Sequence, residues 1–251
     1  MDMLVGTLTL RPYVFAFLAA YLFAAVGDIG WRRTALFSAR TFVVAWTAEF
    51  ASTRIGIPFG LYHYTGTTSA QELYIANVPF FDSLSFVFLA YAAWCLARLW
   101  LSRSHGMATV GVAGVLMMLL DVVLDPLAVR GARWFLGQVF YYPEGGIYFG
   151  VPLSNFAGWV LVGWAAIGGF VLADRRATTS CPNYGVALYY GILVFNLAMT
   201  WWIGEPLLLA VGVLLQAALW TLGMAWSAST RVRPGLDLLA PTSARLSEEN
   251  S

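Results

Sequence analysis

Seven long apolar runs dominate this 251-residue sequence. Each run is close to the roughly 20 residues that an α-helix needs to cross about 30 Å of hydrocarbon. The runs cover residues 10–27, 35–53, 79–100, 108–126, 155–173, 185–203 and 206–226. Charged residues make up only 11% of the chain, against about 25% in a typical soluble domain, so a water-soluble body could not cover its own surface. The sequence therefore predicts an all-α, polytopic membrane bundle of about seven transmembrane helices.

The links between the runs differ in length. Three are short, and the two longer ones cover residues 54–78 and 127–154. Both long links are rich in aromatic residues, glycine and proline, which favours re-entrant or lid-like loops over open solvent loops. We expect residues 1–226 to form a single transmembrane domain. Residues 227–251, rich in Pro, Ser, Glu and Asn, are expected to be a disordered tail.

Arginine supplies the positive charge of the chain, because the sequence contains no lysine. Nine arginines fall in one set of loops and four in the other. Since cytoplasmic loops keep the excess of positive residues, this bias predicts a multi-pass protein of the cell membrane with its N-terminus outside and its C-terminus in the cytoplasm. The minority set, expected on the outer side, consists of Arg11, Arg54, Arg130 and Arg133.

The composition excludes several classes of protein. Without lysine there is no Schiff base, no P-loop and no retinal-binding opsin. His63 and His105 are expected on opposite membrane faces, which excludes a histidine-rich di-iron site, and no CxxC or GxGxxG motif is present. A net charge of +1 without a basic run makes nucleic acid an improbable partner. We therefore expect no cofactor and no metal, and chemistry carried by carboxylates, amides, hydroxyls and aromatic rings.

Acidic residues collect at one depth of the predicted bundle. A carboxylate inside a bilayer is costly unless it is paired, protonated or facing a wet cavity. Five of them at similar depth predict a shared polar cavity toward the outer side, although each could instead lie at the membrane interface. These residues are Glu49, Asp82, Asp121, Asp125 and Glu205.

Asp121 and Asp125 are four residues apart and so share one helix face. Two like charges at this spacing cannot both ionise cheaply, so one carboxyl is expected to keep its proton, as a general acid requires. Pro126 is expected to bias Asp125 away from helical geometry. The alternative is a kinked helix end capped by water.

Glu49 precedes Arg54 by five residues, and the two could pair across a helix end, either as part of the site or as a plain structural salt bridge. The following link contributes Phe59, Tyr62 and Tyr64, either to a tight re-entrant turn or to an interfacial aromatic belt.

The second long link supplies further candidates. Tyr148 lies in a segment too aromatic for an open loop, and Asn155 and Trp159 share one face of the fifth predicted span. Asn155 could hold a water and Trp159 could stack on a polyene or a cation, or both could be helix-packing and belt residues. Asn196 and Gln216, in mid-span, are more typical of interhelical hydrogen bonds.

Several of these segments together resemble a known family, the CruF-type carotenoid hydratases of the membrane carotenoid biosynthesis proteins. The resemblance covers about the middle half of the chain and keeps the family's order. Ala51-Ser52 and Phe80-Phe81-Asp82 depart from the family's pattern, which leaves the carotenoid substrate open. The matching segments are Glu49 followed by RIGIPFGLYHYTG at 54–66, Val78-Pro79, LDVVLDP at 120–126 and YFGVPLSNFAGW at 148–159.

The resemblance implies cofactor-independent hydration of a terminal C=C bond on an acyclic, lycopene-like carotenoid, giving a tertiary alcohol. Such a reaction needs a proton donor, an environment that stabilises a tertiary cation, and a positioned water. We expect Asp121 or Asp125 to be the acid, Glu49 to orient water and accept its proton, and Asn155 to hold that water. The expected substrate-binding residues are Arg54, Phe59, Tyr62, Tyr64, Asp82, Tyr148 and Trp159.

Other functions remain open at the level of sequence. A carotenoid or isoprenoid cyclase would use the same cation and differ only in how the cation is trapped. A proton-coupled transporter would also carry membrane carboxylates, but the chain has no detectable inverted repeat. A non-catalytic scaffold that contacts other carotenoid enzymes is the third alternative. Beyond the carotenoid and water, the expected surroundings are membrane lipid.

Overall fold

The computed structural model describes residues 3–101, 106–174 and 183–232, which form an almost wholly helical bundle. This confirms the predicted all-α class. The helices are α1 (Met3–Leu10), α2 (Pro12–Ile29), α3 (Trp31–Ile55), α4 (Phe80–Trp100), α5 (Met107–Ala128), α6 (Leu153–Ala173), α7 (Asn183–Trp202) and α8 (Pro206–Val232).

Within the described ranges, six helices are long and apolar enough to cross a membrane: α2, α4, α5, α6, α7 and α8. They correspond to six of the seven predicted spans. The remaining prediction, at 35–53, falls within α3, which at 25 residues has the length of a span. Its sequence is more polar than the others, with charged residues that include Arg40 and Glu49, so α3 does not meet the same criterion.

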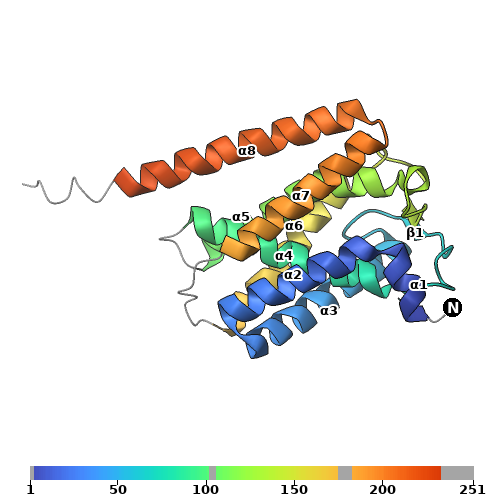
Figure 1. The fold of residues 1–251 in the computed structure, drawn as a ribbon, viewed down its shortest axis with the longest axis horizontal. Coiled ribbons are helices and arrows are strands. Elements are labelled where there is room, and N and C mark those ends of the chain that lie inside the picture. Colours follow the sequence, from blue (N-terminus) through green and yellow to red (C-terminus); the bar gives the residue numbers. More distant parts are fainter. Residues whose placement is uncertain (1–2, 102–105, 175–182, 233–251) are drawn as a thin grey trace, which may run out of the picture.

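α4 forms the centre of the bundle, and its residues from Phe86 to Ala97 are all buried. α5 and α6 pack closely because glycines meet between them: a Cβ added to Gly163 would lie 3.0 Å from the Cα of Gly114. Figure 1 shows α2 and α3 along one side of the bundle and α8 along the opposite side. α8 keeps large apolar residues such as Leu214 and Leu222 exposed, as expected of a helix that faces lipid.

The two long links meet at one end of the bundle, where α1 also lies (Figure 1). β1 (His63–Tyr64) from the first link pairs antiparallel with β4 (Phe140–Tyr141) from the second, and the backbone N–H of Thr65 donates to the carbonyl of Val139 at 2.8 Å. A second short pair, β2 (Tyr74–Ile75) with β3 (Val78–Pro79), leads into α4. The paired links thus form a cover over this end.

Two helix ends differ from the predictions. α5 continues through Pro126 to Ala128, so Asp125 remains helical and the predicted bias away from helical geometry is wrong. Pro126 is buried among neighbouring helices, and such packing tolerates a proline inside a membrane helix. α8 continues to Val232, six residues past the predicted end of the last span at 226, and residues 233–251 lie outside the described ranges.

Candidate active site

A cavity of about 130 Å³ lies inside the bundle beneath the two long links. Helices α2 to α7 and both links contribute to its wall, so residues far apart in sequence face one space. Three of the five predicted carboxylates line it: Glu49 from α3, Asp82 from α4 and Asp125 from α5. The prediction of a shared polar cavity is confirmed for these three.

Asp121 and Asp125 are joined by one amide from α6. The side-chain nitrogen of Asn155 lies 2.7 Å from Oδ2 of Asp121 and 2.7 Å from Oδ2 of Asp125, so the two oxygens are at most twice that distance apart. Asp121 is fully buried behind Asp125, and its Oδ1 has no hydrogen-bond partner among the described residues. Trp159 Nε1 lies 3.4 Å from the same oxygen of Asp125. Two carboxyls this close, out of water, favour a state in which one of them holds a proton.

Glu49 is held by two hydroxyl donors. Tyr64 donates to Oε1 at 2.7 Å, and Ser83 donates to Oε2. The expected pairing of Glu49 with Arg54 is wrong, because Arg54 turns outward, donates to Asn77 Oδ1 at 2.8 Å and lies over the Phe50 ring. Five residues of helix bring Arg54 round to a different face from Glu49.

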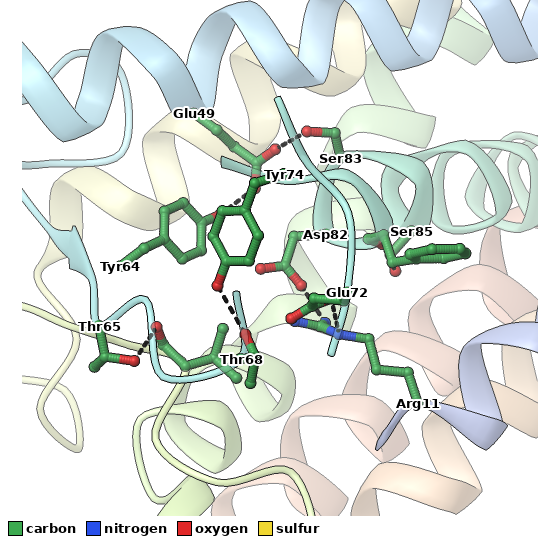
Figure 2. Close-up of polar contacts among 12 residues, drawn as sticks. Arg11, Glu49, Tyr64, Thr65, Thr68, Glu72, Tyr74, Asp82, Ser83 and Ser85 are labelled. Carbon is green, nitrogen blue, oxygen red and sulfur yellow. Dashed lines mark hydrogen bonds and ion pairs between the residues drawn. The ribbon is translucent and has the colours of Figure 1, made fainter. Parts of the chain in front are cut away.

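Asp82 forms an ion pair with Arg11, which precedes α2 (Figure 2). Arg11 is only 2% exposed and also binds Glu72, with Nε 2.8 Å from Oε2 and Nη2 3.0 Å from Oε1. Glu72 comes from the first long link and is buried as well. This ion-pair cluster ties the start of α2, the first link and α4 together at the edge of the cavity.

The rest of the cavity wall is largely aromatic. Trp159 stacks on Phe86, with ring centroids 4.3 Å apart and planes within 8°, and Phe59 packs against both rings. Tyr62 contacts Tyr64 at a centroid distance of 5.4 Å. Burial raises the pKa of both tyrosines well above the usual value for a phenol, so their hydroxyls stay neutral. This part of the wall therefore offers π faces and neutral hydroxyls.

Glycines allow the first link to enter the bundle. Gly60 has a φ of +91°, and a Cβ there would lie 2.8 Å from Ser154 Oγ. A Cβ on Gly158 would lie 2.6 Å from Cδ1 of Phe59 and 2.9 Å from the carbonyl oxygen of Pro58. These contacts place Phe59 against Trp159 on α6.

Besides Asp121, three predicted residues lie outside the cavity wall. Arg54 turns outward and contacts Asn77 and Phe50, as described above. Glu205 pairs with Arg130 and Arg133, so it is an ion-paired residue of the bundle end and not a fourth cavity carboxylate. The Tyr148 hydroxyl is buried without a hydrogen-bond partner among the described residues, and burial, with a smaller contribution from Asp121, raises its pKa to about 12.

The sequence did not single out Arg11, Glu72 or Ser83 for the site. Arg11 and Glu72 are 61 positions apart and become neighbours only when the first link folds over α2, whereas Ser83 lies one residue after Asp82 on α4. Asn196 also lines the cavity, but its amide donates to Ile192 of its own helix, so its predicted interhelical bond is wrong. The interhelical bond of Gln216 is confirmed, since it donates to Leu119 of α5 at 2.7 Å.

The site contains no obvious metal ligand set. Across residues 3–101, 106–174 and 183–232, no three His, Cys, Asp or Glu side chains are grouped as a metal ion would need. The cavity combines carboxyl groups that have different partners with a largely aromatic wall, and such carboxyl groups can transfer protons.

Comparisons with known proteins agree with the resemblance seen in the sequence. The family model described as "Carotenoid biosynthesis protein" matches residues 7–219. A relative from Haloarcula japonica, named bisanhydrobacterioruberin hydratase, is 31% identical over 195 residues. That match covers 73% of this chain and 64% of the relative, somewhat less than two thirds of the relative's length. No solved structure matches. Since the family model spans most of the helical bundle and all the cavity residues, the chain belongs to the carotenoid biosynthesis protein family.

Proposed function

We propose that this protein is a membrane carotenoid hydratase. It would add water to a terminal C=C bond of an acyclic carotenoid and form a tertiary alcohol without a cofactor. Membership of the carotenoid biosynthesis family and the name of the Haloarcula relative support the reaction class. The observation that carries the proposal is the Asp121–Asn155–Asp125 cluster. Of its two carboxyl groups, that of Asp125 lines the aromatic cavity.

The proton donor in this proposal is the Asp121–Asp125 pair. Asp125 lines the cavity and Asp121 lies behind it, so Asp125 is the member that can reach a substrate carbon. A proton shared by two close carboxyls leaves one of them a neutral acid near neutral pH. Asn155 would orient both carboxyls through its amide donors.

The cation formed by protonation would lie against the aromatic wall. Trp159 and Phe86 present stacked π systems, and Tyr62 and Tyr64 add two more rings. Faces of aromatic rings attract cations by about 0.5–2 kcal/mol each, more when water is excluded. Such a wall also provides a slot for the flat polyene next to the reacting bond.

The water would be held on the carboxylate side of the cavity. Glu49 is fixed by Tyr64 and Ser83 and faces the same space as Asp125. We assign Glu49 the task of orienting the water, together with Asn155. The tertiary cation would then be captured by oxygen and not by another double bond, which is what separates a hydratase from a cyclase.

Expression in a bacterial host that accumulates lycopene tests the proposal. Extracted pigments are separated by liquid chromatography and weighed by mass spectrometry. A more polar product that is heavier by one water, with an unchanged visible chromophore, is the expected result. A product of unchanged mass would instead identify a cyclase, and unaltered pigment despite normal membrane abundance would contradict an activity on lycopene.

Within the same host, Asp125→Asn tests the assignment of the acid. It keeps the shape of the side chain and removes the transferable proton. We expect product formation to fall by about 100-fold or more, the usual contribution of a general acid. Product formation at the rate of the unsubstituted protein would remove Asp125 from the mechanism.

A further inference from the structure

We propose that Asp82 is a catalytic base of this site: it takes the proton from the water that adds to the substrate cation, and Arg11 and Glu72 hold it in place for this step. The inference rests on the proposed hydration and refines it by giving two tasks to two residues. Glu49 orients the water, and Asp82 accepts the proton of that water.

The first support is the set of carboxylates that Arg11 binds. All three of its side-chain nitrogens are engaged: Nε and Nη2 with Glu72, and Nη1 with Asp82. A guanidinium this deeply buried stays charged in proteins, so at least one carboxylate beside it must also stay charged. Each nitrogen of Arg11 is thus bound to a carboxylate of Glu72 or Asp82, which fits a residue that positions Asp82.

The second support is a difference between two carboxylates of the cavity. Each oxygen of Glu49 already accepts a hydrogen bond, one from Tyr64 and one from Ser83. In Asp82, Oδ1 binds Arg11, whereas Oδ2 has no hydrogen-bond partner among the described residues. The Asp82 side chain is 18% exposed and lines the cavity, so the unpartnered oxygen is accessible to a water.

The third support is position. Figure 2 shows Asp82 between Glu49 and Tyr64 on one side and Arg11 and Glu72 on the other. Asp82 also lines the same cavity as Asp125, the proposed proton donor. A water that Glu49 orients can therefore meet Asp82 within the space where the cation forms.

The step balances as follows. The acid of the Asp121–Asp125 pair breaks its O–H bond as the alkene π electrons form a C–H bond, which leaves a tertiary cation. A lone pair of water forms the new C–O bond, and one water O–H bond breaks as its proton passes to Asp82 Oδ2. The net change is alkene plus water to alcohol, with one proton moved from the Asp pair to Asp82. Before the next turnover, that proton returns from Asp82 to the Asp121–Asp125 pair through solvent or the cavity water.

Two substitutions at this position test the inference in purified protein reconstituted in lipid nanodiscs, with lycopene or another acyclic carotenoid that the unsubstituted protein hydrates. Asp82→Asn keeps an oxygen for Arg11 and removes the charge. We expect its hydration rate to fall by about 100-fold or more, as for loss of a general base. Asp82→Gly leaves a space beside Arg11, and added formate is expected to restore part of the lost rate by acting as the missing base.

Asp174→Asn is the matched control. Asp174 has a side chain that is also 18% exposed and also pairs with an arginine, Arg33, but it does not line the cavity. We expect this variant to keep the normal rate and to show no response to formate. The comparison separates loss of a base from loss of any arginine partner.

The outcomes distinguish the inference from the proposed function. If the unsubstituted protein hydrates no acyclic carotenoid, the proposed function fails. If it does, and Asp82→Asn retains a rate within about threefold of normal, Asp82 is not the base and the inference is overturned. It is equally overturned if Asp82→Gly folds, loses activity and does not respond to formate, because that pattern belongs to a residue with a structural role only.

Discussion

At the scale of single residues, the three carboxyl groups that line the cavity differ in their hydrogen-bond and ion-pair partners. Asp125 shares an amide donor with a second carboxyl, Glu49 accepts from two hydroxyls, and Asp82 binds a buried arginine. In the proposed mechanism, carboxyl groups therefore serve as acid, as water-holding group and as base, because the environment sets which form of each carboxyl is stable. Asn155 is the residue that donates to both members of the proposed acid pair.

Replacing Asn155 with leucine removes the donor that joins Asp121 and Asp125. Asp121 Oδ2 then loses its donor, and Asp125 Oδ2 keeps only the 3.4 Å contact with Trp159 Nε1. An unsatisfied buried acceptor costs about 1–3 kcal/mol in unfolding free energy, and the proposed acid loses its orientation. We expect a lower thermal midpoint in nanodiscs and almost no hydrated product.

Gln216→Leu serves as its control, since Gln216 also donates to α5 but lies outside the cavity. This variant should have a lower thermal midpoint and a normal amount of hydrated product. Normal product formation by Asn155→Leu would contradict the role of the amide.

Helical periodicity in the sequence was enough to predict which residues of one helix share a face. The spacing of Asp121 and Asp125 placed both on one helix face, and Asn155 and Trp159 were paired correctly on another. It failed for Arg54 and Glu205, and it did not find Arg11, because each depends on how a loop or a helix end turns. Helical spacing contains no information about such turns.

At the scale of elements, the site depends on how the first long link is packed into the bundle. Pro58 and Phe59 approach α6 so closely that only a glycine fits at position 158. This contact sets Phe59 against the Trp159 ring and so fixes part of the aromatic wall.

Gly158→Ala is expected to disrupt that packing. Its Cβ would lie 2.6 Å from Phe59 and 2.9 Å from the Pro58 carbonyl, so the link must shift. Overpacking of this kind typically costs about 1–3 kcal/mol of unfolding free energy. We expect a lower thermal midpoint and a reduced hydration rate.

Gly191→Ala in α7 is the matched control, because nothing lies within 4 Å of the Cβ that would be added there. It should leave the hydration rate unchanged and stabilise the helix by up to about 1 kcal/mol. Equal effects of the two substitutions would show that the contact at Gly158 is not what positions the link.

The sequence predicted the elements better than their contacts. Apolar run length located the helices within a few residues, since the bilayer dictates how long they must be. It did not reveal the pairing of β1 with β4, because two residues per strand leave no periodic pattern. It also misjudged Pro126, where the surrounding helices override the local preference of proline.

At the scale of the whole molecule, arginines are distributed unevenly between the two ends of the bundle. At the end that holds the cavity, Arg11, Arg130 and Arg133 each pair with a carboxylate, and Arg54 lies over Phe50. These are the four arginines of the minority set, whereas the loops expected on the other side carry nine. The side of a membrane protein with fewer arginines is the outer side.

We therefore expect the cavity end to face outward and the C-terminus to lie in the cytoplasm. Fusion of green fluorescent protein to the C-terminus should give fluorescent cells, and fusion of alkaline phosphatase at the same place should give little enzyme activity. The opposite pattern would reverse the orientation and place the cavity toward the cytoplasm.

Hydration itself is the central claim, and isotope-labelled water tests it most directly. Purified protein in nanodiscs is incubated with an acyclic carotenoid in water enriched in oxygen-18, and the product is weighed by mass spectrometry. The proposed mechanism predicts a tertiary alcohol whose new hydroxyl contains the labelled oxygen, formed without any added cofactor. A product of unchanged mass, or an alcohol without the label, would contradict it.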